Sequence, residues 1–267
     1  MTAENAEPLL ACRKVDKYYG ALAAVSKFDL DVWPGDVVGI GGPNGAGKTT
    51  FLDVISGISP ATGGEIIFDG EDIARLSPDR ICHRGIARTY QLNAGFDSLS
   101  IRENVLVGAA FGSGEGLIPS LRFSRQMREN VNRALELCRL TERANQIVRD
   151  IPVLDRKLLM LAGAVATSPK LLLIDEPVGG LNPFEIDLVM EIVSGLIEEG
   201  MTVMLIEHVM RFLLQLSRRV VIMHHGEKIY EGDPEALVSN ERVVEVYLGE
   251  GTANRLKHLM AERGGHG

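Results

Sequence analysis

The stretch VVGIGGPNGAGKTT, from Val37 to Thr50, decides the fold. An apolar run suited to a buried strand leads directly into the pattern G-x-x-x-x-G-K-[ST], and FLDVISG after it can continue as a helix. Backbone N–H groups at such a helix start turn inward and favour a phosphate group. A chance glycine-rich turn would lack this order of strand, loop and helix. The stretch therefore predicts a P-loop α/β core.

The residues of the loop have separate roles in a nucleotide site. Lys48 can reach the β- and γ-phosphates, and the hydroxyl of Thr49 can bind Mg²⁺. The other residues contribute backbone N–H groups and the helix start. The predicted phosphate-binding residues are Gly42, Asn44, Gly45, Ala46, Gly47, Lys48, Thr49 and Thr50.

A second apolar run, LLLIDEP, ends in the two acids Asp175 and Glu176. The first carboxylate can stand beside a metal, and the second can polarise an attacking water. Acid pairs at strand ends are common in α/β proteins, so this pair would carry little weight alone. After a phosphate loop, it predicts a hydrolytic site.

Composition narrows the class of protein. A chain of 267 residues is long enough for one large domain or for a core with an inserted subdomain, and its net charge of −8 argues against a nucleic-acid partner. The N-terminus MTAENAEPLL lacks the basic residues of a signal peptide, and no apolar stretch approaches the length of a membrane span. We expect the chain to stay in the cytosol. Cys12, Cys82 and Cys138 show no paired spacing and are expected to be buried thiols.

Periodicity divides the chain into regions. LLACRKV and AVSKFDLDVW predict an antiparallel β-rich flank, whereas LLLID, TVMLIE and RVVIM alternate with helices such as EIDLVMEIVSGLIEE and predict a mostly parallel sheet. From about Ile101 to Ala166 the pattern is helical, as in VNRALELCRL. We predict one domain over residues 1–249, with a core of 1–91 and 167–249, a helical subdomain at about 92–166, and a tail at 250–267.

Taken together, the motifs resemble the ATP-binding subunits of ABC transporters. KYYGALAAV, GPNGAGKTT, RTYQ, LLLIDEP, GGLNP and LIEHVM occur in that family's order and approximate spacing, from about residue 9 to 249. The resemblance implies a RecA-like core that binds ATP and Mg²⁺ and hydrolyses ATP. It also implies that GLNP, with Leu181 and Asn182, forms the loop that crosses to a second subunit.

The resemblance assigns further residues to the site. Tyr19 would stack on adenine, Gln91 would lie near Mg²⁺ and the attacking water, and His208 would contact the γ-phosphate. Asp175 would assist Mg²⁺ binding, and Glu176 would be the general base. From the residues alone, alternatives stay open: Tyr19 as a core aromatic, the adjacent Tyr18 as the stacking ring, His208 as a structural histidine, and Gln91 as a surface amide.

A finer resemblance is to the ATPases of branched-chain amino-acid importers. RTYQLNAGFDSLSIRENVLVGA, DEPVGGLNP, LIEHVM and VVEVYLGE all look like that branch, although importers of urea, amides or aromatic compounds share much of it. It implies a peripheral subunit on the cytoplasmic face of the inner membrane. Its partners would be transmembrane permease subunits, a second ATPase subunit and, indirectly, a periplasmic or extracellular solute-binding protein. The segment from Leu92 to Ser100 would receive a permease coupling helix.

Two other functions stay open on the same motifs. One is a regulatory ABC module that binds nucleotide and hydrolyses little of it. The other is a non-transport ABC ATPase of DNA repair or translation. The net charge of −8 argues against this function, because a nucleic-acid partner favours an excess of basic residues.

The chain also departs from the family. Gly41 stands where the family usually has an aliphatic residue, Val178 replaces a small or hydroxyl residue, and IPVLD, Ile151 to Asp155, takes the place of the LSGGQ-like signature. Pro152 has no N–H, Leu154 adds bulk and Asp155 adds negative charge, so the signature position should bind ATP poorly. Arg156 and Lys157 after it are expected to be ordinary helix-surface residues. We therefore expect a mixed dimer with a different ATPase subunit that supplies an intact signature.

Overall fold

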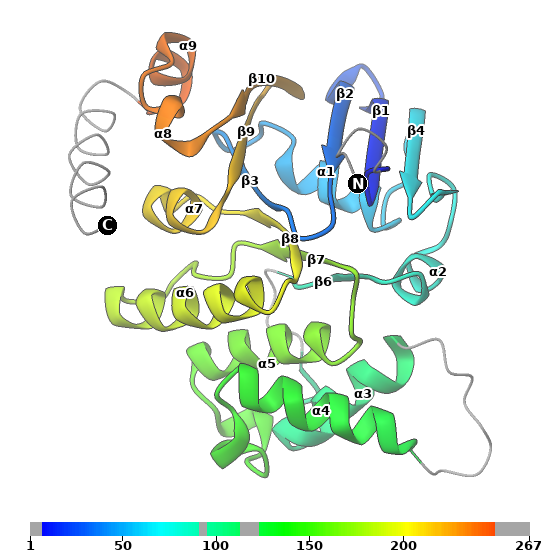
Figure 1. Cartoon of the computed structure of the whole chain (residues 1–267), viewed down its shortest axis with the longest axis vertical. Helices are drawn as coiled ribbons and strands as arrows, with labels where there is room; N and C mark the ends of the chain where they lie inside the picture. Colours follow the sequence, from blue (N-terminus) through cyan, green and yellow to red (C-terminus); the bar gives the residue numbers. More distant parts are fainter. Residues whose placement is uncertain (1–6, 91–94, 113–122, 249–267) are drawn as a thin grey trace, which may run out of the picture. The chain divides into compact units, whose positions relative to one another are not determined.

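The structure is a computed structural model that describes residues 7–90, 95–112 and 123–248. It divides into two compact units, one of Met1–Arg75 with Met204–Gly267 and one of Leu76–Val203 (Figure 1). Each unit is described by itself. The predicted C-terminal tail at 250–267 lies outside the described residues. Over the described ranges, no helix combines the length and apolar character that crossing a membrane requires.

The first unit contains an antiparallel sheet with the strand order β2-β1-β4-β5. Its strands are β1 (Leu10–Tyr19), β2 (Leu22–Val32), β4 (Gly63–Phe68) and β5 (Glu71–Asp72). In the register, Leu10 pairs with Val32 on one side and with Phe68 on the other. All three side chains are buried, so one face of this sheet contributes to the core. The predicted antiparallel flank is confirmed.

The same unit holds the strand that carries the phosphate loop. β3 (Val37–Gly41) pairs in parallel with β9 (Arg219–His224), and β10 (Glu227–Gly232) pairs with β9 as a hairpin. All residues of β3 are buried, as an apolar strand in a covered parallel sheet should be. The helices of this unit are α1 (Lys48–Ile55), α7 (Met210–Leu216), α8 (Pro234–Leu237) and α9 (Glu241–Val243), followed by a π-helical turn at Val244–Leu248.

The second unit pairs β6 (Ile86–Arg88) in parallel with β7 (Leu171–Asp175), whose residues are all buried. Its helices are α2 (Pro78–His83), α3 (Ile101–Gly112), α4 (Arg125–Leu137), α5 (Val153–Val165) and α6 (Pro183–Glu198). α3 packs against both α4 and α5 (Figure 1). A Cβ atom on Gly108 would lie 3.0 Å from the carbonyl oxygen of Gly163, so α3 and α5 approach closely there.

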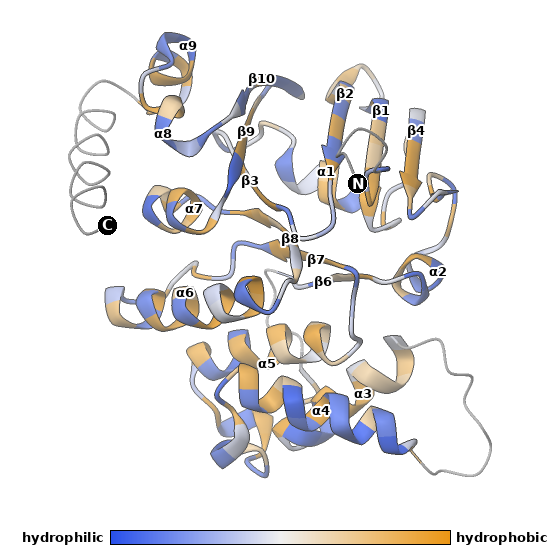
Figure 2. Cartoon of the chain, viewed as in Figure 1, coloured by the Kyte–Doolittle hydropathy of each residue, from blue (hydrophilic) through white to orange (hydrophobic). Residues whose placement is uncertain are grey.

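Helix α4 shows why the insertion is helical. It buries Met127, Val131, Ala134 and Leu135, whose spacing places them on one face, and Figure 2 shows hydrophilic residues in bands along the rest. Ser124 caps the helix by accepting a hydrogen bond from the N–H of Met127. The predicted helical insertion is confirmed over α3, α4 and α5.

The division into units differs from the predicted domain boundaries. Along the chain, the boundaries between the compact units fall between residues 75 and 76 and between residues 203 and 204. The second boundary lies inside β8 (Thr202–Ile206). The division into a core of 1–91 and 167–249 and a helical subdomain of about 92–166 therefore stays a prediction.

One expectation about the cysteines was wrong. Cys12 and Cys138 are fully buried; burial raises the pKa of the Cys12 thiol to about 12, and burial also raises the pKa of the Cys138 thiol. Cys82 is only half-buried, because it lies on the short surface helix α2.

Candidate nucleotide-binding and hydrolysis site

The phosphate loop joins the end of β3 to the start of α1. Gly42 and Gly47 have φ angles of 144° and 101°, which side chains rarely tolerate. A Cβ atom on Gly42 would lie 2.2 Å from the carbonyl oxygen of Met223, and one on Gly47 would lie 2.1 Å from that of Ala24. The loop is therefore held against β9 and β2 at two places where only glycine fits.

Helix α1 presents its start to this loop. The helix begins at Lys48, directly after Gly47, and its first turn contains no acidic residue. Its unpaired N–H groups and the positive end of its dipole favour an anion. Asn44, Gly45 and Thr49 are exposed, so the phosphate side of the loop is open, while Ala46 is buried and accepts a hydrogen bond from the N–H of Gly226 at 2.9 Å.

Lys48 lies within the loop that it serves. Only 5% of its surface is exposed, and its Nζ donates to the carbonyl oxygens of Gly42 at 2.7 Å and Pro43 at 2.9 Å. The ammonium is thus already held at the phosphate loop, so its charge is organised before a phosphate binds.

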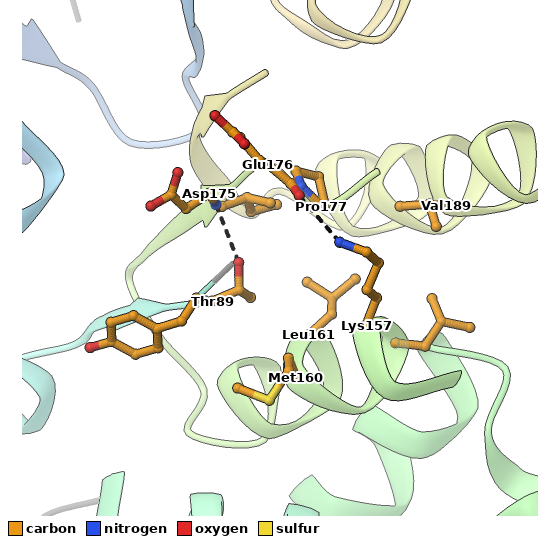
Figure 3. A pocket seen from close by; sticks show the side chains of 11 residues that line it. Thr89, Lys157, Met160, Leu161, Asp175, Glu176, Pro177 and Val189 are labelled. Carbon is orange, nitrogen blue, oxygen red and sulfur yellow. Dashed lines mark hydrogen bonds between the residues drawn. The ribbon is translucent and has the colours of Figure 1, made fainter. Parts of the chain in front are cut away.

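At the end of β7, Asp175 forms a buried ion pair. Its Oδ2 is 2.9 Å from a guanidinium nitrogen of Arg88, and the side chains are 2% and 4% exposed. The N–H of Asp175 donates to the Thr89 hydroxyl at 3.3 Å (Figure 3). The sequence analysis missed Arg88, although it is the first residue of the RTYQ motif. A cation at the end of the short strand β6 was the available signal.

Glu176 has a left-handed backbone, with a φ of 48°. Its carbonyl oxygen is 3.4 Å from Nζ of Lys157 and 3.5 Å from the N–H of Gly179. Figure 3 shows the Glu176 carboxylate pointing away from Lys157 while the Lys157 ammonium approaches the carbonyl. Lys157 is therefore not the ordinary surface residue that the sequence predicted, because α5 brings it against the peptide that carries Glu176.

The pocket drawn in Figure 3 lies beside these acids. It is lined mainly by apolar side chains, including Leu158, Met160, Leu161 and Val189, with Lys157, Asp175 and Glu176 at its edge. Such a lining does not suit a triphosphate, so the interior of this pocket is not a candidate site for the phosphates.

His208 follows β8 and is exposed. The preceding Glu207 is 2% exposed, and its carboxylate accepts hydrogen bonds from the N–H groups of His208 at 2.8 Å and Val209 at 3.1 Å. Glu207 therefore shapes the turn that leaves His208 at the surface. The sequence analysis quoted Glu207 within LIEHVM but assigned it no role.

Comparison with known proteins identifies the family of this chain. A family model described as ABC transporter matches residues 25–179. This chain belongs to the ABC transporter family.

Relatives match over almost their whole length. The high-affinity branched-chain amino acid transport ATP-binding protein LivG of Escherichia coli is 33% identical over 252 residues, which cover 91% of this chain and 99% of LivG. The corresponding protein BraF of Pseudomonas aeruginosa is 35% identical over 251 residues, covering 91% of this chain and 98% of BraF.

A solved structure gives the same result. The ADP conformation of MJ1267, an ATP-binding cassette of an ABC transporter, matches with a TM-score of 0.81 and 28% identity, covering 91% of this chain and 100% of that one. The chain is thus an ABC-type ATPase subunit that binds nucleotide, built on the predicted P-loop α/β fold.

The two tyrosines considered for adenine stacking in this ABC ATPase are the last residues of β1. Tyr18 and Tyr19 are 41% and 51% exposed, so Tyr19 is not a core aromatic. The Tyr19 hydroxyl is 3.2 Å from the Ser59 hydroxyl, and Nζ of Lys17 lies 4.9 Å from the ring centroid. Stacking of either ring on adenine stays a prediction. Gln91, predicted to lie near Mg²⁺, falls outside the described residues.

The signature position of this ABC ATPase is the start of α5. Pro152 is its N-cap residue and makes no side-chain capping hydrogen bond, while Val153 is 52% exposed. Asp155 does not add negative charge to this face as predicted, because its carboxylate is buried and hydrogen-bonded to Arg143. Arg156 lies on the helix surface, where it pairs with Asp97 at 3.0 Å. The lost N–H of Pro152 and the bulk of Leu154 therefore carry the departure from the family pattern.

The GLNP loop leads into α6. Asn182 caps this helix by accepting hydrogen bonds from the N–H groups of Phe184 and Glu185, and the Glu185 carboxylate accepts one from the N–H of Asn182. This capping box holds the loop in one shape. It also leaves Phe184, directly after GLNP, 87% exposed.

Proposed function

We propose that this chain is the ATP-hydrolysing subunit of an ABC importer for branched-chain amino acids or related small polar solutes. The observation that supports this function best is the glycine-restricted loop between β3 and α1 with Lys48 held inside it. The names of LivG and BraF, which describe branched-chain amino acid transport, support the substrate class.

The residues present suit MgATP. Mg²⁺ in nucleotide sites is held by one or two protein oxygens together with the phosphates, and it neutralises charge on the transferring group. The exposed hydroxyl of Thr49 and the carboxylate of Asp175 are oxygen donors of that kind. Among the described residues, no three His, Cys, Asp or Glu side chains gather into a metal site of their own.

In the proposed reaction, each residue acts on one part of the substrate. Lys48 and the N–H groups of the loop hold the β- and γ-phosphates, which positions the reacting phosphorus. Glu176 accepts a proton from the attacking water, and the Lys157 contact holds the peptide from which Glu176 projects. Gln91 and His208 orient the water and the γ-phosphate, and Tyr19 stacks on adenine.

The energy of binding and hydrolysis is proposed to close and reopen a pair of ATPase subunits. These subunits work with transmembrane permease subunits at the cytoplasmic face of the inner membrane, and a solute-binding protein delivers the transported molecule to the permease. The exposed Phe184 beside the GLNP loop fits a contact with the second subunit, since large exposed apolar side chains mark interaction surfaces.

We further propose that the pair is a mixed dimer. The start of α5, where the family reads the γ-phosphate of the opposite subunit, has lost an N–H at Pro152 and carries the Leu154 side chain. Two copies of this chain would form two defective sites. An intact signature from a different ATPase subunit would complete the site made by this chain's own loop, Glu176 and His208.

The test is ATP turnover by the full-length chain alone, with candidate permease subunits, and with a candidate second ATPase subunit of different sequence. Activity that requires the second subunit, or that appears when Pro152→Ser and Leu154→Gly repair the signature, supports the mixed dimer. Brisk hydrolysis by the chain alone would sink it. MgATP affinity that Lys48→Ala leaves unchanged would overturn the assignment of the phosphate loop, and tight binding with little turnover in every assembly would favour a regulatory module.

A further inference from the structure

The helical part of the second unit contains a cavity that the proposed reaction does not use. It lies between α4 and the C-terminal ends of α5 and α6, and its volume is about 170 Å³. Figure 1 shows these three helices in the same unit, where α4 packs against α5 and also approaches α6. The cavity therefore belongs to one compact unit, and its walls come from three helices.

The wall of the cavity combines apolar side chains with one ion pair. Ala134 and Val165 are buried, and Leu137 and Met201 are partly buried. Arg133 and Glu199 line the same cavity, but their side chains are 67% and 40% exposed. The interior is thus apolar, and the charges stand on the solvent side.

The ion pair joins α4 to the end of α6 beside the cavity. Nη2 of Arg133 lies 2.6 Å from Oε2 of Glu199. An exposed pair of this kind contributes little to stability, so a ligand that separates the two charges loses little by doing so. The planar guanidinium of Arg133 suits a carboxylate, because it can donate two parallel hydrogen bonds.

The electrostatics around Glu199 favour a further positive charge. Glu199 is the C-cap residue of α6, and Val165, which also lines the cavity, is the last residue of α5. The C-terminal end of a helix carries a partial negative charge that favours cations. Two helix ends and one carboxylate therefore meet near a single guanidinium among the described residues of the wall, and an ammonium group would be stabilised beside Glu199.

The size and lining together define the class of ligand. Sites for drug-sized molecules measure about 300–1,000 Å³, so this cavity suits a smaller molecule. We propose that the cavity binds a free aliphatic amino acid: the carboxylate pairs with Arg133, the ammonium pairs with Glu199, and the side chain fills the apolar interior. The site goes beyond the proposed ATPase function and does not depend on it, because the phosphate loop belongs to the other unit.

The first experiment is calorimetric titration of the full-length chain with L-leucine and with two analogues that each lack one charge. Isoamylamine lacks the carboxylate, and isocaproate lacks the ammonium. L-leucine should bind with a Kd of about 0.1–1 mM, the scale expected for a ligand of so few atoms. Each analogue should bind at least about tenfold more weakly, because one charged partner stays unpaired. No binding of L-leucine, or equal binding of either analogue, would overturn the proposal.

Substitutions test the two charged contacts against a matched pair. Arg133→Gln and Glu199→Gln should each raise the Kd for L-leucine at least about tenfold. The control is Arg139→Gln, because Arg139 pairs with Glu191 at 2.9 Å, joins the same two helices, and does not line the cavity in the described part of the chain. This control should keep the wild-type Kd within about twofold. Equal loss of affinity in all three variants would mean that the pairs only hold the helices together, and the proposal would fail.

A measurement on the wild-type chain locates the bound amino acid without any variant that alters the cavity charges. In nuclear magnetic resonance spectra of chain with isotope-labelled methionine, L-leucine should shift the methyl signal of Met201, which lines the cavity, more than that of Met127, which lies elsewhere on α4. The Met201→Leu spectrum assigns the signal. Binding that leaves the Met201 signal in place would put the ligand elsewhere and sink the proposal. Failure of the proposed ATPase function looks different, since it would appear as absent MgATP binding and leave the L-leucine titration unchanged.

Discussion

The ion pair between Arg88 and Asp175 allows a quantitative test of how the acid at the end of β7 is held. Replacing Arg88 with Met removes the guanidinium and keeps a side chain of comparable length. Both partners are almost completely buried, with side chains 4% and 2% exposed and a distance of 2.9 Å. Solvent therefore cannot replace the lost partner of the Asp175 carboxylate, in contrast to a surface pair.

The expected loss of stability follows from this burial. Removing one partner of a buried ion pair destabilises a protein by about 3–5 kcal/mol. Asp175 has further interactions, including the hydrogen bond between its N–H and Thr89, so we expect the lower end, about 3 kcal/mol. For a chain of this size, that corresponds to a fall in Tm of roughly 6–12 °C. Replacing both residues, as in Arg88→Met with Asp175→Leu, should recover most of the loss, because no charge is then left buried.

The assay is denaturant unfolding of the full-length chain without nucleotide, followed by circular dichroism. The control is Arg125→Met, which breaks the exposed pair with Glu129 in α4, where the side chains are 91% and 50% exposed. The free energy of unfolding should change there by less than about 0.5 kcal/mol. If Arg88→Met costs no more than this control, or if the double variant is less stable than either single one, the reasoning about the buried pair is refuted.

Three further outcomes are expected. Glu176→Gln should keep MgATP affinity and slow turnover in the assembled complex by about 10²- to 10⁴-fold, as loss of a general base does, and unchanged kcat would remove Glu176 from that role. Gly47→Ala should abolish measurable MgATP binding, because its Cβ would lie 2.1 Å from the carbonyl oxygen of Ala24. The control is Gly20→Ala: Gly20 also has a positive φ, but a Cβ there meets no atom within 4 Å, so this variant should bind MgATP normally in the same titration. A photocrosslinker at Phe96, which is 58% exposed, should capture a permease subunit in membranes more efficiently than one at Phe111, which is 60% exposed; equal capture at both sites would contradict a coupling surface there.

The elements that carry the candidate phosphate site could be predicted because their pattern is local in the chain. The strand, the loop and the helix from Val37 to Ile55 follow one another without interruption, and glycines, lysine and threonine occupy fixed places in that order. The same holds for the acids that end β7 and for His208 after β8. For Tyr19, the exposure of the ring excluded one alternative that the sequence had left open.

Other parts of the site could not be predicted, because the partners are distant in sequence. Arg88 and Asp175 are 87 residues apart, and Lys157 and Glu176 are 19 apart. A carboxylate such as Asp155 is read from sequence as a surface charge, and only the position of Arg143 shows that it is buried and compensated. Acidic and basic residues give no signal of their partner until packing brings them together.

The sequence by itself determined that this chain carries a phosphate loop after a buried parallel strand and two adjacent acids at the end of a second strand. It also determined that the signature position has a proline in place of a phosphate-binding residue. These features depend on backbone N–H groups, φ angles and side-chain types, which are properties of short segments. The tertiary structure decided that Arg88 holds Asp175, that Arg143 neutralises Asp155, and that Lys157 lies against the Glu176 carbonyl oxygen. Burial raises the cost of an unpaired polar group, so contacts between distant segments determine which charges and hydroxyls are compensated and which remain for a ligand.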